Sequence, residues 1–226
     1  MSRTEAESFV DEIERTLGSL ITPSLTNASA PPKLFEAYIL MLILQAAVKE
    51  QAQLTYESIN NRSTTQFIFR GGPGYIYSNE NDYTHAVITF ANKPELEAHI
   101  NIRVSGKSKV LHECDVAVLD RAEAKTCRAK RVMPRHSALM LAVECKYYAS
   151  TLELGLGRNF MGLVRDIRHK HSEIHFVTNT THEPIQTLLV YYAEKWQSEI
   201  RPTIPNNVDR LRSLFQEAFK NFKQRK

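Results

Sequence analysis

Three residues in two apolar segments have the types and spacing that metal-assisted hydrolysis needs. Asp115 lies within the segment HECDVAVLD, and Glu144 and Lys146 lie two residues apart within LMLAVECKYY. Both segments are predicted strands, and the two-residue repeat of a strand places Glu144 and Lys146 on the same face. A carboxylate in a segment suited to burial is costly unless a cation or hydrogen bonds stabilise it. Asp115 is therefore expected to have a partner.

A hard divalent cation would relieve the repulsion between the two carboxylates. Mg²⁺ and Mn²⁺ bind through oxygen, so the expected ligands are Asp115, Glu144 and the backbone carbonyl of Cys145. Lys146 would lie beside the attacking water and the phosphate, as an ammonium or as an amine with a lowered pKa, and would stabilise negative charge. These groups suit phosphodiester hydrolysis. The other interpretation of the same residues is a cross-strand salt bridge on a solvated sheet face.

The segments around these residues predict an α/β fold. Helical spacing of apolar residues predicts a surface helix over 2–20, and an apolar stretch predicts a buried helix over 34–48. Strands are predicted at 66–70, 75–77, 83–90, 97–104, 114–119, 139–147 and 174–177, and further helices at 153–169, 184–196 and 208–222, the last followed by a basic tail. We expect one domain over 1–226: a mixed β-sheet flanked by helices, with its core at about 34–177, an N-terminal helix, a β-rich insertion around Gly71 and C-terminal helices within 184–226.

In this order of elements the chain resembles the PD-(D/E)xK nuclease superfamily. The resemblance rests on Asp115 followed by Glu144-Cys145-Lys146 on the next strand, and it covers about 34–177. It implies a restriction-endonuclease-like core of helix, three strands, helix and strand. Two features depart from the pattern: Cys114 replaces the proline of the name, and the connection 120–138 is long.

The resemblance also implies supporting residues on two helices. Glu36 matches a glutamate that many members place on the first core helix. A carboxylate favoured by the helix dipole is the alternative for this residue. Arg158 or Asn159 is placed like the polar residue that many members carry on the helix after the ExK strand.

The function that the resemblance implies is Mg²⁺- or Mn²⁺-dependent hydrolysis of DNA, with RNA not excluded. The spacing is similar to that of some antiviral effector nucleases, which suggests a defence or restriction role and a possible partner protein. A homodimer or higher oligomer is expected if two sites cut two strands. The leading alternative is a catalytically inactive module that keeps the nuclease fold and binds nucleic acid or protein. A structural subunit of a defence or repair assembly is the third.

The segment 121–135 is interpreted as a basic loop. Its six positive charges against one negative charge suit a phosphate backbone, although a solvated loop has the same composition. Tyr147 and Tyr148 are expected to pack in the core rather than stack on bases. Spacing at His169, His171, His175 and His182 fits neither a zinc finger nor HExxH, so no metal is assigned there.

Composition sets the remaining limits. The chain of 226 residues is 42% hydrophobic and 24% charged with a net charge of +4, which is ordinary for a globular protein and permits a polyanionic partner. Its three cysteines form no CxxC pair, which favours free thiols in a reducing compartment. The longest apolar run is too short for a membrane span, and the opening residues lack secretory signal features, so we expect a soluble cytoplasmic protein.

Overall fold

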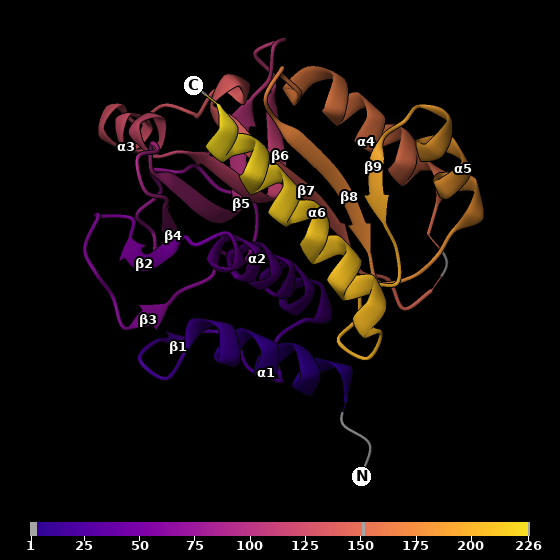
Figure 1. Ribbon diagram of the computed structural model, residues 1–226, viewed down its shortest axis with the longest axis horizontal. Coiled ribbons are helices and arrows are strands. Elements are labelled where there is room, and N and C mark those ends of the chain that lie inside the picture. The colour runs from indigo at the N-terminus through magenta and orange to yellow at the C-terminus, as the bar shows by residue number, and fades with distance from the viewer. Residues whose placement is uncertain (1–3, 151, 226) are drawn as a thin grey trace.

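A seven-stranded mixed sheet runs through the computed structural model, which describes residues 4–150 and 152–225 (Figure 1). In sheet order the strands are β2 (Gln53–Ser58), β4 (Thr84–Thr89), β5 (Leu96–Ser105), β6 (Leu111–Asp120), β7 (Leu139–Lys146), β8 (Glu173–Thr178) and β9 (Lys195–Gln197). Pairing is antiparallel from β2 to β7 and parallel from β7 to β9. The short strands β1 (Thr22–Pro23) and β3 (Gln66–Phe67) pair separately. The prediction of a mixed sheet is confirmed.

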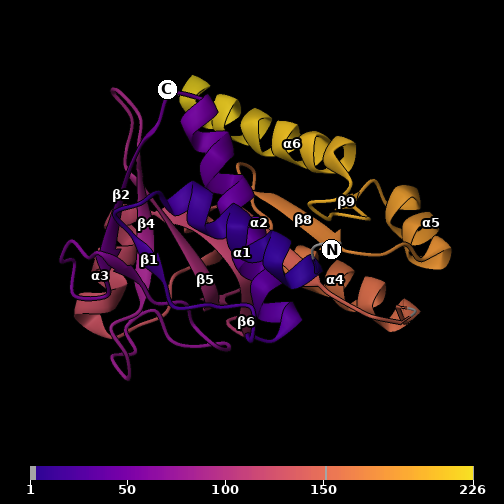
Figure 2. The same ribbon diagram turned by 90° about the horizontal axis from the view of Figure 1, so that it is seen from below.

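Helices cover both faces of this sheet. On one face α1 (Glu5–Leu17), α2 (Pro31–Lys49) and α6 (Pro205–Gln224) share an apolar core with the strands. On the other face α3 (Arg121–Lys130), α4 (Leu154–Ile167) and α5 (Glu183–Tyr191) form a second core. Figure 2 shows α6 and α4 on opposite sides of β8. The sheet is therefore buried between two layers of helices, as its apolar strand sequences require.

The N-terminal helix α1 begins at a capping box. Thr4 Oγ1 accepts a hydrogen bond from the Glu7 N–H at 3.3 Å, and the Glu7 carboxylate accepts one from the Thr4 N–H at 2.8 Å. These two bonds satisfy backbone donors that a helix N-terminus otherwise leaves unpaired. The helix ends at Gly18, whose φ of 77° suits glycine. The predicted helix is confirmed with shorter bounds, and Ser2 and Arg3 lie outside the described residues.

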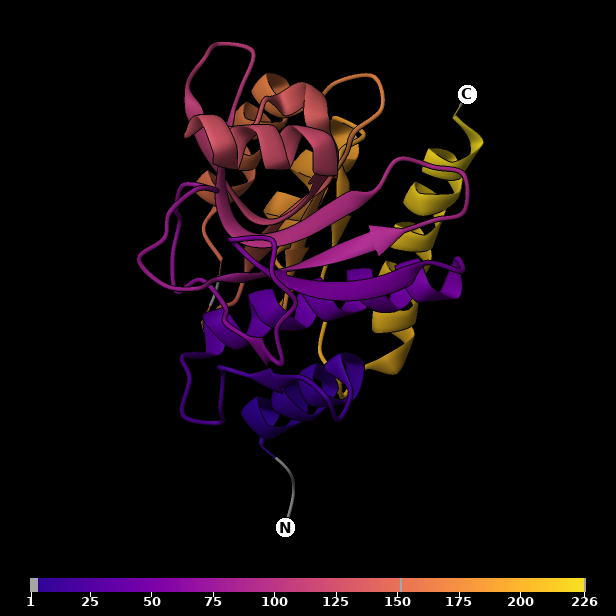
Figure 3. The ribbon, with the colours of Figure 1, turned by 90° about the vertical axis from the view of Figure 1, so that its left-hand side faces the viewer.

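The central helix α2 is buried on nearly all sides. Among the described residues it is the one helix that is long and apolar enough to cross a membrane, and 67% of that stretch is buried inside the protein. It packs against both α1 and α6, and Figure 3 shows it beneath the sheet, with α1 on its far side. Burial of this kind is what the core helix of a globular domain shows.

The predicted basic loop at 121–135 is wrong, because most of it is the helix α3. Asp120 caps this helix, with its Oδ1 accepting the Glu123 N–H at 2.9 Å, and Arg131 ends it in the left-handed conformation. Alanines and long unbranched side chains favour a helix, but the density of charge concealed the short apolar side formed by Ala124 and Cys127.

Other predictions need correction. The predicted helix over 184–196 ends at Tyr191, because Ala193 has a φ of 53° and reverses the chain into β9. The predicted strand at 75–77 is a loop: Gly74 makes one bridge to Ile102, and the Ser78 N–H then bonds the Tyr75 carbonyl in a turn. The predicted strand at 66–70 is shortened to β3, so the insertion around Gly71 is mostly loop and not β-rich. Strand β2 was not predicted, because its polar alternation QLTYES carries little apolar signal.

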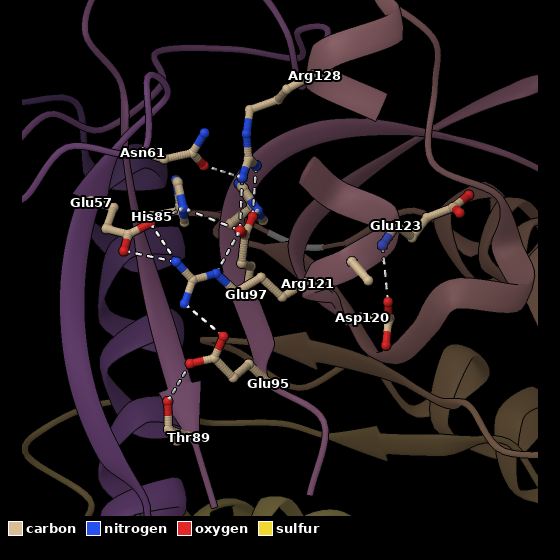
Figure 4. Close-up of polar contacts among 12 residues, drawn as sticks. Glu57, Asn61, His85, Thr89, Glu95, Glu97, Asp120, Arg121, Glu123 and Arg128 are labelled. Atoms are coloured by element: carbon tan, nitrogen blue, oxygen red, sulfur yellow. Dashed lines mark hydrogen bonds and ion pairs between the residues drawn. The ribbon is translucent and has the colours of Figure 1, made fainter. Parts of the chain in front are cut away.

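A buried ion network connects α3 to the edge of the sheet (Figure 4). Glu97 of β5 accepts two hydrogen bonds from Arg128, at 2.6 and 2.7 Å, and a third from His99 at 2.9 Å. Arg121 bonds Glu57 of β2 through both carboxylate oxygens at 2.8 Å. Burial alone would raise the pKa of Glu97, but hydrogen bonds from Arg128 and the neighbouring histidines hold it well below its usual value. Glu97 is therefore a permanent buried anion.

We predict that Arg128→Met lowers the free energy of unfolding by about 3–5 kcal/mol, because it leaves the Glu97 charge buried without its bidentate arginine partner. Urea denaturation measures this change. Lys130→Met is the matched control, since Lys130 is exposed on the same helix and its loss should cost less than about 0.5 kcal/mol. Equal midpoints for the two variants would show that the network does not stabilise the fold.

Candidate active site

Strands β6 and β7 separate at Asp115. Their antiparallel pairing ends at Val116 and Val143, and beyond this point Asp115 Oδ2 accepts the Cys145 N–H at 2.7 Å. A side-chain carboxylate thus replaces the strand carbonyl that would otherwise bond this amide. On the other side of β7, pairing with β8 continues as far as Lys146. The Asp115 carboxylate therefore lies between the two strands where their backbone pairing ends.

The structure brings Asp115, Glu144 and Lys146 together at this point. Lys146 Nζ lies 2.6 Å from Glu144 Oε1 and 3.6 Å from Asp115 Oδ2. The exposed side-chain fractions are 8% for Asp115, 19% for Glu144 and 22% for Lys146. The salt bridge that sequence offered as an alternative is therefore present, but its side chains are largely buried rather than on a solvated face. We use the word recess for this largely buried place around Asp115, Glu144 and Lys146.

A kink in the β5–β6 pair shapes the recess. Asn101 has a φ of 51° and lies opposite Asp115, between the pairs Ile100–Val116 and Ile102–Cys114. The first pair packs in the core with α2, and the second packs in the core with α4. On both strands, the apolar side chains therefore switch from one face of the sheet to the other at Asn101 and Asp115. A left-handed backbone at asparagine is tolerated because its short polar side chain can hydrogen-bond locally.

Asn101 links this kink to α2 and Glu36. Its Nδ2 donates to Glu36 Oε2 at 2.7 Å. Burial, together with the nearby Asp115, raises the pKa of Glu36 to about 7, against the opposing effect of the hydrogen bond from Asn101. Because α2 begins at Pro31, Glu36 lies in its second turn, beyond the range in which the helix dipole favours an acid. Glu36 is therefore placed at the recess by its contact with Asn101.

Sequence reasoning missed a fourth carboxylate at Glu113. Burial and the nearby Asp115 raise its pKa, and Lys146 and Arg103 lower it. The signal was present in the sequence, since Glu113 precedes Asp115 by two residues on the same predicted strand. Glu36, Asp115 and Glu144 are thus partly or fully buried at the recess, and Glu113 is an exposed carboxylate beside them, so four carboxylates lie near the ammonium of Lys146.

The charges in the recess depend on one another. Burial raises the pKa values of both Asp115 and Glu144, and the negative charge of Asp115 raises that of Glu144 further. Burial would lower the pKa of Lys146, but the two carboxylates outweigh it and raise the pKa above its usual value. Without a metal, Lys146 is thus an ammonium and the counter-ion of the site. Of the two forms that sequence allowed for Lys146, the structure favours the ammonium.

The remaining predicted site residues differ in position. Arg158 and Asn159 are exposed on α4, and no contact among the described residues connects either of them to the recess. Cys145 contributes its backbone to the recess, because its N–H donates to Asp115. Its thiol is buried, and burial raises the thiol pKa. Tyr147 packs on Phe9 and Phe35 and donates a hydrogen bond to Glu5, so the prediction of packing is confirmed for it.

A second group of potential metal ligands lies in the ion network. His85, Glu97 and His99 are buried, and their ligand atoms lie within 4.8 Å of one another, so by atom type and spacing they could hold a metal. Burial lowers the pKa of His99 to about 3, which leaves a neutral imidazole. The group of His85, Glu97 and His99 was not predicted from the sequence, although Glu97 and His99 have the spacing that puts two side chains on one face of a strand.

The recess at Asp115 and the His85–Glu97–His99 group differ in their balance of charge. Glu97 and Glu57 are already neutralised by Arg128 and Arg121, so a divalent cation would bring excess positive charge into a buried site. The recess at Asp115 has the opposite balance, with more carboxylates than cations and only hard oxygen donors. It is the better site for Mg²⁺ or Mn²⁺.

Comparison of the chain with protein-family models, with curated proteins and with solved structures finds no match.

We predict that Glu36→Gln changes how stability depends on pH in the metal-free protein. The carboxyl binds its proton more tightly in the folded state, at a pKa of about 7 against 4.5, so wild-type stability falls as the pH rises through this window. Relative to wild type, the variant should gain up to about 3 kcal/mol between pH 4.5 and pH 7.

Urea denaturation in EDTA at several pH values tests this prediction. Glu217→Gln, an exposed change on α6, is the control and should follow wild type. A Glu36→Gln curve parallel to wild type would show that Glu36 titrates normally.

Proposed function

We propose that this protein is a metal-dependent nuclease that hydrolyses DNA phosphodiester bonds. The observation that carries the proposal is the separation of β6 from β7, which gathers Asp115, Glu144 and Lys146 in one recess. Asp115, Glu144 and the carbonyl of Cys145 would hold Mg²⁺ or Mn²⁺. The ion would supply positive charge to the scissile phosphate and acidify the attacking water.

The residues of the chain have distinct roles in this proposal. In the metal-free protein the Lys146 ammonium is occupied by Asp115 and Glu144. If a cation bound to Asp115 and Glu144, it would replace Lys146 as their counter-ion. The ammonium could then donate to a phosphate oxygen and stabilise the charge that develops during hydrolysis. Glu36, fixed by Asn101, borders Asp115 and supports the site. Arg158 is assigned no part, because its exposed position gives no contact with the recess.

The order of elements supports a restriction-endonuclease-like core. After the buried helix α2 come β2, β3 and β4, then the antiparallel strands β5 and β6, then α3 and the antiparallel strand β7, and then α4 crosses over to β8, which is parallel to β7. Apart from the inserted β2, β3, β4 and α3, this order corresponds to the helix, three strands, helix and strand that the resemblance implies. Restriction or antiviral defence in the cytoplasm is the proposed setting, with a second copy or a partner protein joining two sites.

We predict that Glu144→Gln and Lys146→Ala each reduce metal-dependent cleavage by on the order of 10² to 10³, the usual cost of one preorganised electrostatic group. Asp115→Asn should reduce it as well, while its side-chain oxygen can still accept the Cys145 N–H. The assay offers plasmid, linear duplex, single-stranded DNA and RNA, each with Mg²⁺ or EDTA. Lys220→Ala and Glu217→Gln, both exposed on α6, are the matched controls.

Wild-type rates in the Glu144 and Lys146 variants would contradict the assignment. Binding of nucleic acid without any cleavage by the wild type, with every divalent ion tested, would favour the alternative of an inactive binding module.

A further inference from the structure

Two tyrosines and two arginines form a row on the surface beside the recess. Tyr75 and Tyr77 stack with ring centroids 5.3 Å apart and an angle of 20° between the rings. The guanidinium of Arg103 lies 5.6 Å from the Tyr75 ring, and that of Arg131 lies 5.2 Å from the Tyr77 ring. We call these four residues the tyrosine–arginine row. They come from the loop after Gly74, from β5 and from the end of α3.

The row borders the recess through β5. Gly74 forms a bridge to Ile102, next to the kink at Asn101, and this bridge fixes the start of the tyrosine loop. Arg103 pairs across the strands with Glu113, whose pKa responds to both Arg103 and Lys146. A strand of nucleic acid that follows the row toward Arg103 therefore arrives at the recess.

The groups in the row have unused binding capacity. Neither guanidinium donates a hydrogen bond to any residue that the structure describes, although each carries five N–H donors. Arg131 and Tyr75 are exposed, and Arg103 and Tyr77 are partly exposed. By contrast, Arg121, Arg128 and Arg135 have their donors committed to carboxylates. Among Arg103 and the arginines of 121–135, the guanidinium groups without a hydrogen bond to a described residue are therefore those of Arg103 and Arg131.

We propose that the tyrosine–arginine row binds single-stranded nucleic acid and leads it into the recess. The inference rests on the proposed nuclease function and adds the substrate class. Guanidinium groups bind phosphate oxygens through paired N–H donors, and bases also stack on guanidinium planes. Each tyrosine ring is covered by the other ring and by a guanidinium group, so bases would stack on the outer guanidinium planes that the rings hold in place. A duplex keeps its bases stacked on one another, so it cannot use these planes in this way. Free single strands, or single-stranded ends of a duplex, are the ligands that fit.

Binding measured in EDTA tests this inference without requiring cleavage. The probe is a labelled single-stranded DNA oligonucleotide, followed by fluorescence anisotropy. Tyr75→Ala and Tyr77→Ala should each weaken binding roughly tenfold, because each removes the ring that holds one stacking guanidinium group in place, and this is within the range for loss of one base stack. The phenylalanine variants should restore it. Tyr191→Ala, at a tyrosine 80% exposed on α5 that also contacts a second tyrosine, is the matched control and should bind as wild type does.

Two further measurements separate stacking from charge. An abasic oligonucleotide should bind wild type more weakly and should abolish the difference between wild type and the Tyr75 variant. Arg103→Ala and Arg131→Ala should make the salt dependence of binding shallower by about 0.7 per lost phosphate contact on a single strand. Thermal melting of each variant confirms that it is folded.

The outcomes distinguish this inference from the proposed function. Tyrosine-dependent binding of the single strand without cleavage supports the row and contradicts the nuclease assignment. If wild type cleaves nucleic acid but Tyr75→Ala and Tyr77→Ala bind as tightly as Tyr191→Ala, the inferred role of the row is overturned. The nuclease assignment then stays intact. Tighter binding of a blunt duplex than of the single strand also overturns it.

Discussion

The hydrogen bond from the Cys145 N–H to Asp115 keeps two central strands apart at the point where chemistry is proposed. If β6 and β7 paired along their full length, the amide of Cys145 would bond a backbone carbonyl and Asp115 would have no place between the strands. Pairing of β7 with β8 on its other side keeps β7 extended. It is therefore β6 that leaves the pairing, and it kinks together with β5 at Asn101. The kink in turn places Asn101 against Glu36. One side-chain hydrogen bond therefore positions groups from α2, β5, β6 and β7.

The two buried charge clusters of this protein illustrate different solutions to the cost of burying carboxylates. At Glu97 the anion is matched by the fixed guanidinium groups of Arg128 and Arg121, and the cluster ties α3 to the sheet. In the recess the carboxylates share one flexible ammonium, Lys146, and their pKa values are raised. A cluster whose carboxylate charges are already matched by arginines serves stability, whereas a cluster with excess negative charge favours binding of a cation.

Sequence predicted the recess better than it predicted its surroundings. The alternation of Glu144 and Lys146 and the apolar context of Asp115 are local features, so the strand period alone placed them. Glu97, His85 and Arg128 lie on three separate elements, and their association depends on the register of β4 with β5 and on α3, neither of which a charge count reveals. The same charge count made α3 look like a loop suited to phosphate. Arg103 and the tyrosines were missed because a single bridge at Gly74, between segments far apart in sequence, brings them to the recess.

Calorimetric titration of Mn²⁺ into metal-free protein tests most directly which cluster holds a cation. Wild type, Asp115→Asn and His99→Gln would be compared after each is shown to be folded. We predict binding to wild type and to His99→Gln with similar affinity, and loss of binding in Asp115→Asn, because the recess supplies the carboxylate ligands. Retention of binding in Asp115→Asn with its loss in His99→Gln would place the cation in the ion network and contradict the proposed site.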